Sequence, residues 1–206
     1  MIRLVFKPLG FLSVWGITLI CVGSANAQNL IVNGSFEQGV FTDTGAGYDR
    51  LLVGSTAMTG WTVVTNEIVW GGPSNGDQIT APDGQYFLDL TSYGRINPIG
   101  GVSQSITTVP GTLYHFSFTL FNPVDSSAFS VEANAGSTSM TLTHSGGFDF
   151  TATSGSTPIT IVGNEGGFFV GIDNVRITAV PAPSTLITLL IGAVPGAAVL
   201  LRRRRK

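Results

Sequence analysis

The residues best suited to chemistry are aromatic side chains that stand beside polar groups in loop-like stretches. Flat faces of a sugar ring stack on Trp or Tyr, while the sugar hydroxyls need hydrogen-bond partners. If the chain binds a sugar, Trp70, Tyr93 and Arg95 are the best candidates, with Tyr48 behind them, because they lie in Gly-rich or Asn-rich stretches. Trp70 has an even chance of packing inward, and Trp61 is expected in the core.

Catalytic side chains are only weakly indicated. Serine chemistry needs a histidine base and an orienting acid, and neither His115 nor His144 is accompanied by a nucleophile-elbow motif. Paired carboxylates for glycoside hydrolysis need only be close in space, so the twelve acidic residues leave that alternative open. Most of these acids stand singly in turn-like stretches, where Asp is favoured for its turn geometry. We therefore predict a protein without enzymatic activity.

The first 27 residues have the layout of a secretory signal peptide. Arg3 and Lys7 form the positive region, residues 9–22 the apolar stretch, and Ala25 and Ala27 the small-x-small cleavage site for signal peptidase. The alternative is a membrane anchor, for which fourteen apolar residues are short. Cleavage would also remove Cys21, the only cysteine, so the mature chain would have neither a disulfide nor a cysteine nucleophile.

The C-terminal residues 180–206 read as a second targeting segment. A proline-containing motif at residues 180–184 precedes an apolar run at 185–201, which is at the lower limit for a transmembrane helix. Five cations follow and favour a cytoplasmic C-terminus, with the inner membrane crossed during export: Arg202, Arg203, Arg204, Arg205 and Lys206. The alternative, a buried core helix, would need a polar face that this run lacks.

The charge of the region between these ends is strongly negative. It contains Arg50, Arg95 and Arg176 against all twelve acidic residues, a net charge of −9. Such a domain should repel nucleic acid, so we predict no nucleic-acid partner. Solubility outside the cell is sufficient to explain the charge, and affinity for divalent cations is the sharper alternative.

Residues 28–179 predict a single all-β domain, a jelly-roll β-sandwich. The clearest strand is 113–121, in which Tyr114, Phe116, Phe118 and Leu120 share one face, and we expect it to form a hairpin with 101–107. The last predicted strand, 168–177, changes parity near Asp173, which predicts a bulge. Further strands are predicted at 61–65, 86–90, 128–132, 139–143, 148–152 and 159–162.

Two terminal segments of this domain resemble known proteins. The opening residues 29–37 (NLIVNGSFE) and closing residues 171–177 (GIDNVRI) look like the first and last strands of galactose-binding-like β-sandwiches, which include many carbohydrate-binding modules. The pieces between them, 60–61, 82–86, 101–104 and 111–114, fit in order and spacing. The resemblance implies polysaccharide as a partner, and the glycan prediction draws mainly on it.

The same resemblance implies a structural calcium ion (Ca2+). In that family such an ion commonly links the beginning and end of the domain, which here points to Glu37 and Asp173, helped by backbone carbonyls near residues 83–84. Hard oxygen ligands suit calcium, which would offset the repulsion between two carboxylates. The alternative is a solvated Glu37 and an Asp173 that binds backbone amides across the bulge.

The tail resembles the PEP-CTERM sorting signal, which an exosortase reads. Pro181, Pro183 and Ser184 match its motif, and Ala182 stands where that signal has Glu. The resemblance implies transient anchoring in the inner membrane and delivery to the cell surface or extracellular matrix. We predict a non-enzymatic, glycan-binding surface protein; the alternatives are a structural or adhesive matrix protein without a small-ligand site, and a glycoside-active enzyme.

Overall fold

The computed structural model describes residues 28–91, 99–124, 128–165 and 167–181. The predicted signal peptide and the tail from residue 182 lie outside these ranges. The described residues form eleven β-strands and no helix, which confirms the predicted all-β class. None of the described segments is a helix with the length and apolar character needed to span a bilayer.

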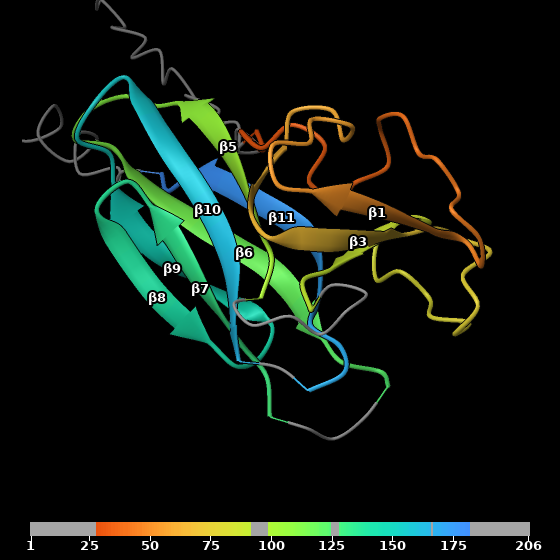
Figure 1. Ribbon diagram of the computed structural model, residues 1–206. Helices are drawn as coiled ribbons and strands as arrows, with labels where there is room; N and C mark the ends of the chain where they lie inside the picture. The colour runs from red at the N-terminus through yellow and green to blue at the C-terminus, as the bar shows by residue number, and fades with distance from the viewer. Residues whose placement is uncertain (1–27, 92–98, 125–127, 166, 182–206) are drawn as a thin grey trace, which may run out of the picture.

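The strands form two antiparallel sheets (Figure 1). The six-stranded sheet contains, in spatial order, β1 (Tyr48–Leu52), β3 (Glu67–Gly71), β4 (Phe87–Asp89), β11 (Gly171–Ala179), β6 (Leu113–Phe121) and β9 (Gly146–Thr151). The five-stranded sheet contains β2 (Thr62–Thr65), β5 (Gly101–Thr107), β10 (Ser156–Glu165), β7 (Ser130–Ala135) and β8 (Thr138–Leu142). Figure 1 shows the five-stranded sheet lying across β6, β9 and β11.

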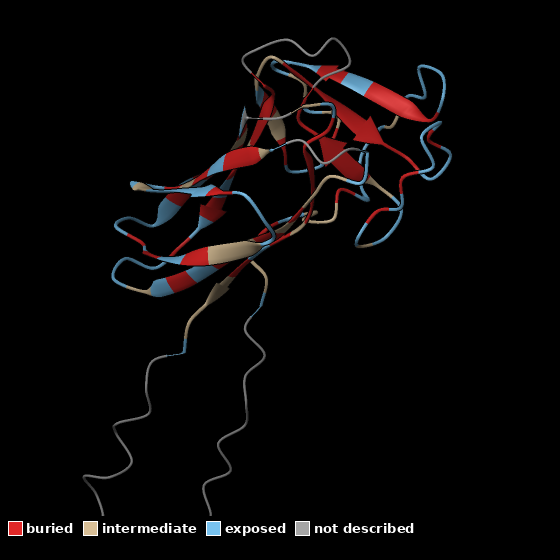
Figure 2. Cartoon of the chain, turned by 90° about the horizontal axis from the view of Figure 1, so that it is seen from below, coloured by how far each residue is buried: buried red, intermediate tan, exposed pale blue. Residues whose placement is uncertain are grey.

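The main core lies between the two sheets and is built by period-two alternation. In β6 the predicted inward residues Tyr114, Phe116, Phe118 and Leu120 are all buried, as the alternation requires. They share one hydrophobic cluster with Val102 and other inward residues of the five-stranded sheet. Figure 2 shows buried positions alternating with exposed ones along the strands of this half of the sandwich.

The predicted hairpin between residues 101–107 and 113–121 is wrong. β5 pairs with β2 and β10, whereas β6 pairs with β9 and β11, so the two segments belong to opposite sheets. The five residues between them cross from one sheet to the other. In this crossing the Thr108 N–H and hydroxyl donate to the carbonyls of residues 155 and 154, and the Gly111 N–H donates to the carbonyl of residue 152. Both strands bury one apolar face, and alternation alone does not distinguish edge-to-edge pairing from face-to-face packing.

The opening segment 29–37 is a series of turns and not the first strand that the resemblance implied. Asn33 and Phe36 have φ angles of 54° and 59°, which interrupt an extended chain. The side chain of Asn29 instead ties the segment to β11, because its Oδ1 accepts the N–H of Ile177 at 2.9 Å. Phe36 is fully buried in the main core, so the segment closes one side of the sandwich.

The bulge predicted in the last strand is confirmed. The register between β11 and β6 shifts between Asp173 and Arg176, and Asn174 has a φ of 51°. The strand then continues to Ala179. Near its end the Leu30 N–H donates to the Ile177 carbonyl at 2.8 Å, and the Val180 N–H donates to the Leu113 carbonyl at 2.9 Å. The two ends of the described chain therefore leave the same end of the sandwich (Figure 2).

A second, smaller core covers part of the outer face of the six-stranded sheet. Residues 72–86, which connect β3 to β4 and are called the pocket loop below, fold back over this face. Ile79 and Ala81 of the loop pack there against buried residues of the sheet and of the segment before β11: Tyr48, Val69, Phe87 and Phe169. This packing fixes the pocket loop against the sheet and thereby positions the candidate site.

Candidate functional site

The structure buries Trp70, the first residue of the predicted glycan site. Its side chain is 1% exposed, and its indole N–H donates to the Phe36 carbonyl at 3.1 Å. The ring packs against Phe41 and Tyr86, with centroids 5.2 and 5.4 Å away. The prediction that Trp70 offers a free face to a sugar is therefore wrong, because β3 is buried on both faces at this point. Tyr93 and Arg95 lie outside the described residues.

The two predicted calcium ligands are both held by backbone N–H groups. Asp173, which is fully buried, accepts the N–H of Asn174 at 2.6 Å and that of Asp83 at 2.7 Å, one on each carboxylate oxygen. Glu37 is exposed, and its Oε1 accepts the N–H groups of Gln85 and Tyr86, both at 2.8 Å. These bonds join the opening segment, the pocket loop and β11.

Asp173 has an electrostatic environment that favours its neutral form. Burial raises the pKa of Asp173 to about 7, and the nearby carboxylates of Asp83 and Glu37 raise it further, against the opposing effect of the two amide hydrogen bonds. Asp83 is itself held by the hydroxyl of Ser35, which donates at 2.7 Å.

The described residues show few of the oxygen ligands that a calcium ion needs. Among the described residues, no group of three or more His, Cys, Asp or Glu side chains is placed to hold a metal ion. Calcium takes six to eight oxygen ligands. Residues 83–86 reach these carboxylates through N–H groups, whereas the calcium prediction assigned carbonyl groups there. Each Asp173 oxygen accepts one amide hydrogen bond and has a further lone pair, and calcium binding stays a prediction.

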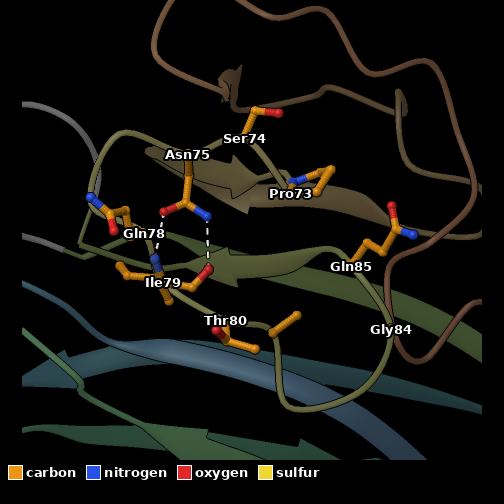
Figure 3. A pocket seen from close by; sticks show the side chains of 9 residues that line it. Pro73, Ser74, Asn75, Gln78, Ile79, Thr80, Gly84 and Gln85 are labelled. Carbon is orange, nitrogen blue, oxygen red and sulfur yellow. Dashed lines mark hydrogen bonds between the residues drawn. The ribbon is translucent and has the colours of Figure 1, made fainter.

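A pocket of about 420 Å³ opens at the pocket loop (Figure 3). Its volume lies within the range of small-molecule sites. The lining is polar and uncharged, with amide and hydroxyl groups beside proline, glycine and aliphatic surface: Pro73, Ser74, Asn75, Gln78, Ile79, Thr80, Ala81, Gly84 and Gln85. Figure 3 shows Gln78 and Gln85 on opposite sides of this opening, which we call the polar pocket. It can offer hydrogen bonds to a neutral, hydroxylated ligand.

Asn75 fixes the shape of the polar pocket through hydrogen bonds to the backbone. It is 5% exposed, and its amide bonds both to the N–H of Ile79 at 2.7 Å and to the carbonyl of Ile79 at 2.8 Å (Figure 3). The same amide donates to the Gly72 carbonyl at 2.8 Å. Between these anchors Gln78 adopts a φ of 55°, a left-handed conformation that is uncommon outside Gly, Asn and Asp.

Sequence comparison places this chain in a family. A family model described as "Protein of unknown function (DUF642)" matches residues 29–166, which include the opening segment and the whole pocket loop. The chain belongs to the DUF642 family. No curated protein matches the chain.

Solved structures similar to this DUF642 protein include several carbohydrate-binding modules. TmCBM61 in complex with beta-1,4-galactotriose is 15% identical, with 74% of this chain and 99% of the other covered and a TM-score of 0.43. "Family 16 Carbohydrate Binding Module-2" is 14% identical, with 73% and 99% covered and a TM-score of 0.43. The CBM22-1 xylan-binding domain from Paenibacillus barcinonensis Xyn10C is 13% identical, with 68% and 100% covered and a TM-score of 0.39.

The polar pocket of the DUF642 domain was missed from sequence. Its residues are Ser, Thr, Asn, Gln and Pro in a turn-rich stretch, a composition that predicts a loop but not its packing against a sheet. The one available signal was Ile79 and Ala81, apolar residues alternating within that loop. Their spacing is consistent with the observed burial of one side of the loop.

Proposed function

We propose that this DUF642 protein is an exported, non-enzymatic protein that binds glycans through the polar pocket. The observation that carries the proposal is the chemistry of the lining, which combines neutral amides and hydroxyls with aliphatic surface and, among the residues that the structure describes, contains no charged side chain. Sugars are recognised by such groups, because each ring has hydroxyls around its edge and apolar C–H faces. The resemblance of the terminal motifs to galactose-binding-like sandwiches favours the same ligand class.

A binding role is favoured over hydrolysis by the burial of the two carboxyl groups whose pKa is raised. Burial raises the pKa of both Asp89 and Asp173, which is the shift expected of a general acid. Both carboxyls are buried, however, and their oxygens accept hydrogen bonds from Thr91, Val170, Asp83 and Asn174. A catalytic carboxyl must reach the glycosidic oxygen, which neither can do from these positions.

The test is binding of the purified full-length protein to a panel of neutral polysaccharides, measured by calorimetry. The double variant Gln78→Ala with Gln85→Ala removes two exposed amides from the polar pocket and should lower affinity about tenfold or more, given the usual contribution of hydrogen bonds. The control is Thr107→Ala with Thr141→Ala, two exposed positions on the five-stranded sheet. Equal affinities of the two double variants would contradict binding through the polar pocket, and absence of binding to the whole panel would favour a structural matrix role.

Export and sorting form a separate part of the proposal. The signal peptide at 1–27, with its Ala25 and Ala27 site, would direct secretion, and the tail at 180–206 would be read by an exosortase. A chain that lacks residues 180–206 should be lost from the cell surface and appear in the soluble exported fraction. Normal surface retention of that truncated chain, measured by cell fractionation, would overturn the sorting proposal.

A further inference from the structure

A second pocket lies directly beside the polar pocket. Its volume is about 550 Å³, and it shares Gln78, Ile79 and Thr80 with the polar pocket. Its other lining residues are Asp77, from the pocket loop, and Pro123 and Val124, which follow β6. Residues 78–80 therefore form a ridge with one pocket on each side.

The ridge is held rigidly in a strained conformation. Gln78 has a φ of 55°, and the buried Asn75 side chain bonds both the N–H and the carbonyl of Ile79. Strained backbone that the surroundings hold in place is concentrated at ligand-binding sites. A ligand that follows the surface from one pocket to the other would cross this fixed ridge.

The second pocket differs from the polar pocket in its charge. Asp77 is the one charged residue among the described residues that line it, and it is exposed. The Tyr48 hydroxyl donates to Asp77 Oδ2 at 2.7 Å, while Asp77 Oδ1 accepts no hydrogen bond from the described residues. Burial, followed by the bond to Asp77, raises the pKa of Tyr48, so the phenol stays protonated and keeps the carboxylate in place.

The charges around Asp77 favour a cation as its ligand. Asp89 lies beneath the same region and close enough for the Asp77 charge to contribute to its raised pKa, after the larger effect of burial. An ionised Asp89 would repel the Asp77 carboxylate, and the region 28–180 carries a net charge of −9. A positive group at Asp77 Oδ1 would offset this repulsion.

An ammonium group fits the pocket better than a metal ion does. Calcium needs six to eight oxygens, whereas an ammonium group has three N–H donors. Asp77, the Gln78 amide and the Thr80 hydroxyl provide acceptors along one segment, and Pro123 and Val124 provide apolar surface for the C–H groups of a ring. We infer that the glycan spans both pockets and that Asp77 selects a glycan with free amino groups. This inference rests on the proposed glycan-binding function.

The experiment measures binding of the purified full-length protein to three β-1,4-linked tetramers. Their sugars are glucosamine, N-acetylglucosamine and glucose. Calorimetry is performed below the pKa of the sugar amine, so that glucosamine is charged. Wild-type protein should bind the glucosamine tetramer about tenfold more tightly than the other two, as expected for a charge-assisted hydrogen bond. Asp77→Asn should remove that preference and leave the affinity for the neutral tetramers within about twofold.

Two controls separate the charge effect from damage to the fold. Glu132→Gln makes the same charge change at an exposed position of β7 and should keep the preference. Added sodium chloride should weaken binding of the glucosamine tetramer to wild-type protein more than binding of the glucose tetramer, because salt screens the ion pair. This salt titration needs no variant and therefore does not depend on the folding of Asp77→Asn.

The outcomes distinguish the two proposals. Equal affinity of wild-type protein for all three tetramers, or an equal effect of Asp77→Asn on each of them, would overturn amino-sugar selection while glycan binding stands. Absence of binding to every tetramer and to the neutral polysaccharide panel would overturn the proposed function and the inference together.

Discussion

Asp173 shows how a buried carboxyl can close the sandwich without a cationic partner. Its two oxygens accept amide hydrogens from β11 and from the pocket loop, and no ion pair to it occurs among the described residues. The amides stabilise the ionised form, but burial and the neighbouring carboxylates outweigh them and raise its pKa to about 7. The closure should therefore depend on pH.

We predict that the protein loses stability as the pH rises through the neutral range. The folded state binds the Asp173 proton more tightly than the unfolded chain does, so the contribution of this proton is present at low pH and is lost between about pH 4 and pH 7. From about pH 5 to pH 8 the free energy of unfolding should fall by about 2 to 3 kcal/mol. Urea unfolding at a series of pH values measures this change.

The variant Asp173→Asn separates this effect from that of other acids. Asparagine does not titrate, so the decline should become shallower, leaving the slope that Asp89, whose pKa burial also raises, contributes. Identical slopes for wild-type protein and Asp173→Asn would show that Asp173 is not the titrating group.

The calcium prediction has its sharpest test where Asp173 is ionised. At about pH 8 a divalent cation would offset the repulsion among Asp173, Asp83 and Glu37, and a ligand that binds only the folded state raises the unfolding midpoint. If calcium binds there, the midpoint of wild-type protein should rise by about 5 °C relative to a chelator, and that of Asp173→Asn by much less. A wild-type midpoint that calcium leaves unchanged would mean that hydrogen bonds within the protein hold these carboxylates without a cation.

Among the elements, the pocket loop depends most on a single side chain. Asn75 makes three hydrogen bonds of 2.7 to 2.8 Å to the backbone of Gly72 and Ile79, all at buried positions. Asn75→Ala would leave these backbone groups unsatisfied and should lower the free energy of unfolding by about 2 to 4 kcal/mol. Chemical denaturation measures the loss, and glycan affinity should fall as well because the ridge at Gln78 is no longer held.

The matched control for this change is Asn134→Ala on β7. Asn134 is partly exposed, and its side chain makes a single bond of 3.1 Å to the Thr160 hydroxyl. Its replacement should cost less than about 0.5 kcal/mol and leave glycan affinity unchanged. Similar losses in the two variants would contradict the special role of Asn75.

The sequence predicted strands best where one face of the strand is buried and the other is exposed to solvent. The strands 113–121 and 101–107 match their predicted bounds because their inward residues alternate with polar ones. β3 has all five residues buried, since the main core lies on one side and the pocket loop covers the other, so it shows no alternation and was missed. Trp70 was assigned to a loop for the same reason.

Strand partners and the candidate site were less accessible from sequence. The partners of β5 and β6 depend on which sheet each strand joins, a choice made by contacts far along the chain. The polar pocket depends on the pocket loop folding over the outer face of the six-stranded sheet, which its turn-rich composition does not encode locally. Composition and alternation therefore predicted the class of fold and not the place of the site.

At the scale of the whole molecule, the pockets lie far from the chain ends. β6 begins at Leu113, beside Val180, and ends at Phe121, just before the Pro123 wall of the second pocket. Nine residues of strand span about 30 Å. If the tail is anchored in a membrane, the sandwich should stand on its terminal end and hold both pockets away from the bilayer.

This orientation predicts unequal distances from the bilayer for two labelled positions. In a Cys21→Ser background, Thr80→Cys carries a fluorophore at the pockets and Thr178→Cys carries one near the end of β11. After reconstitution of the chain with residues 180–206 into vesicles that contain a quenching lipid, the label at position 178 should be quenched strongly and the label at 80 weakly. Chains without the tail should show little quenching at either position. Equal quenching at both positions with the tail present would mean that the sandwich lies flat on the membrane, where the bilayer would compete with a glycan for the pocket loop.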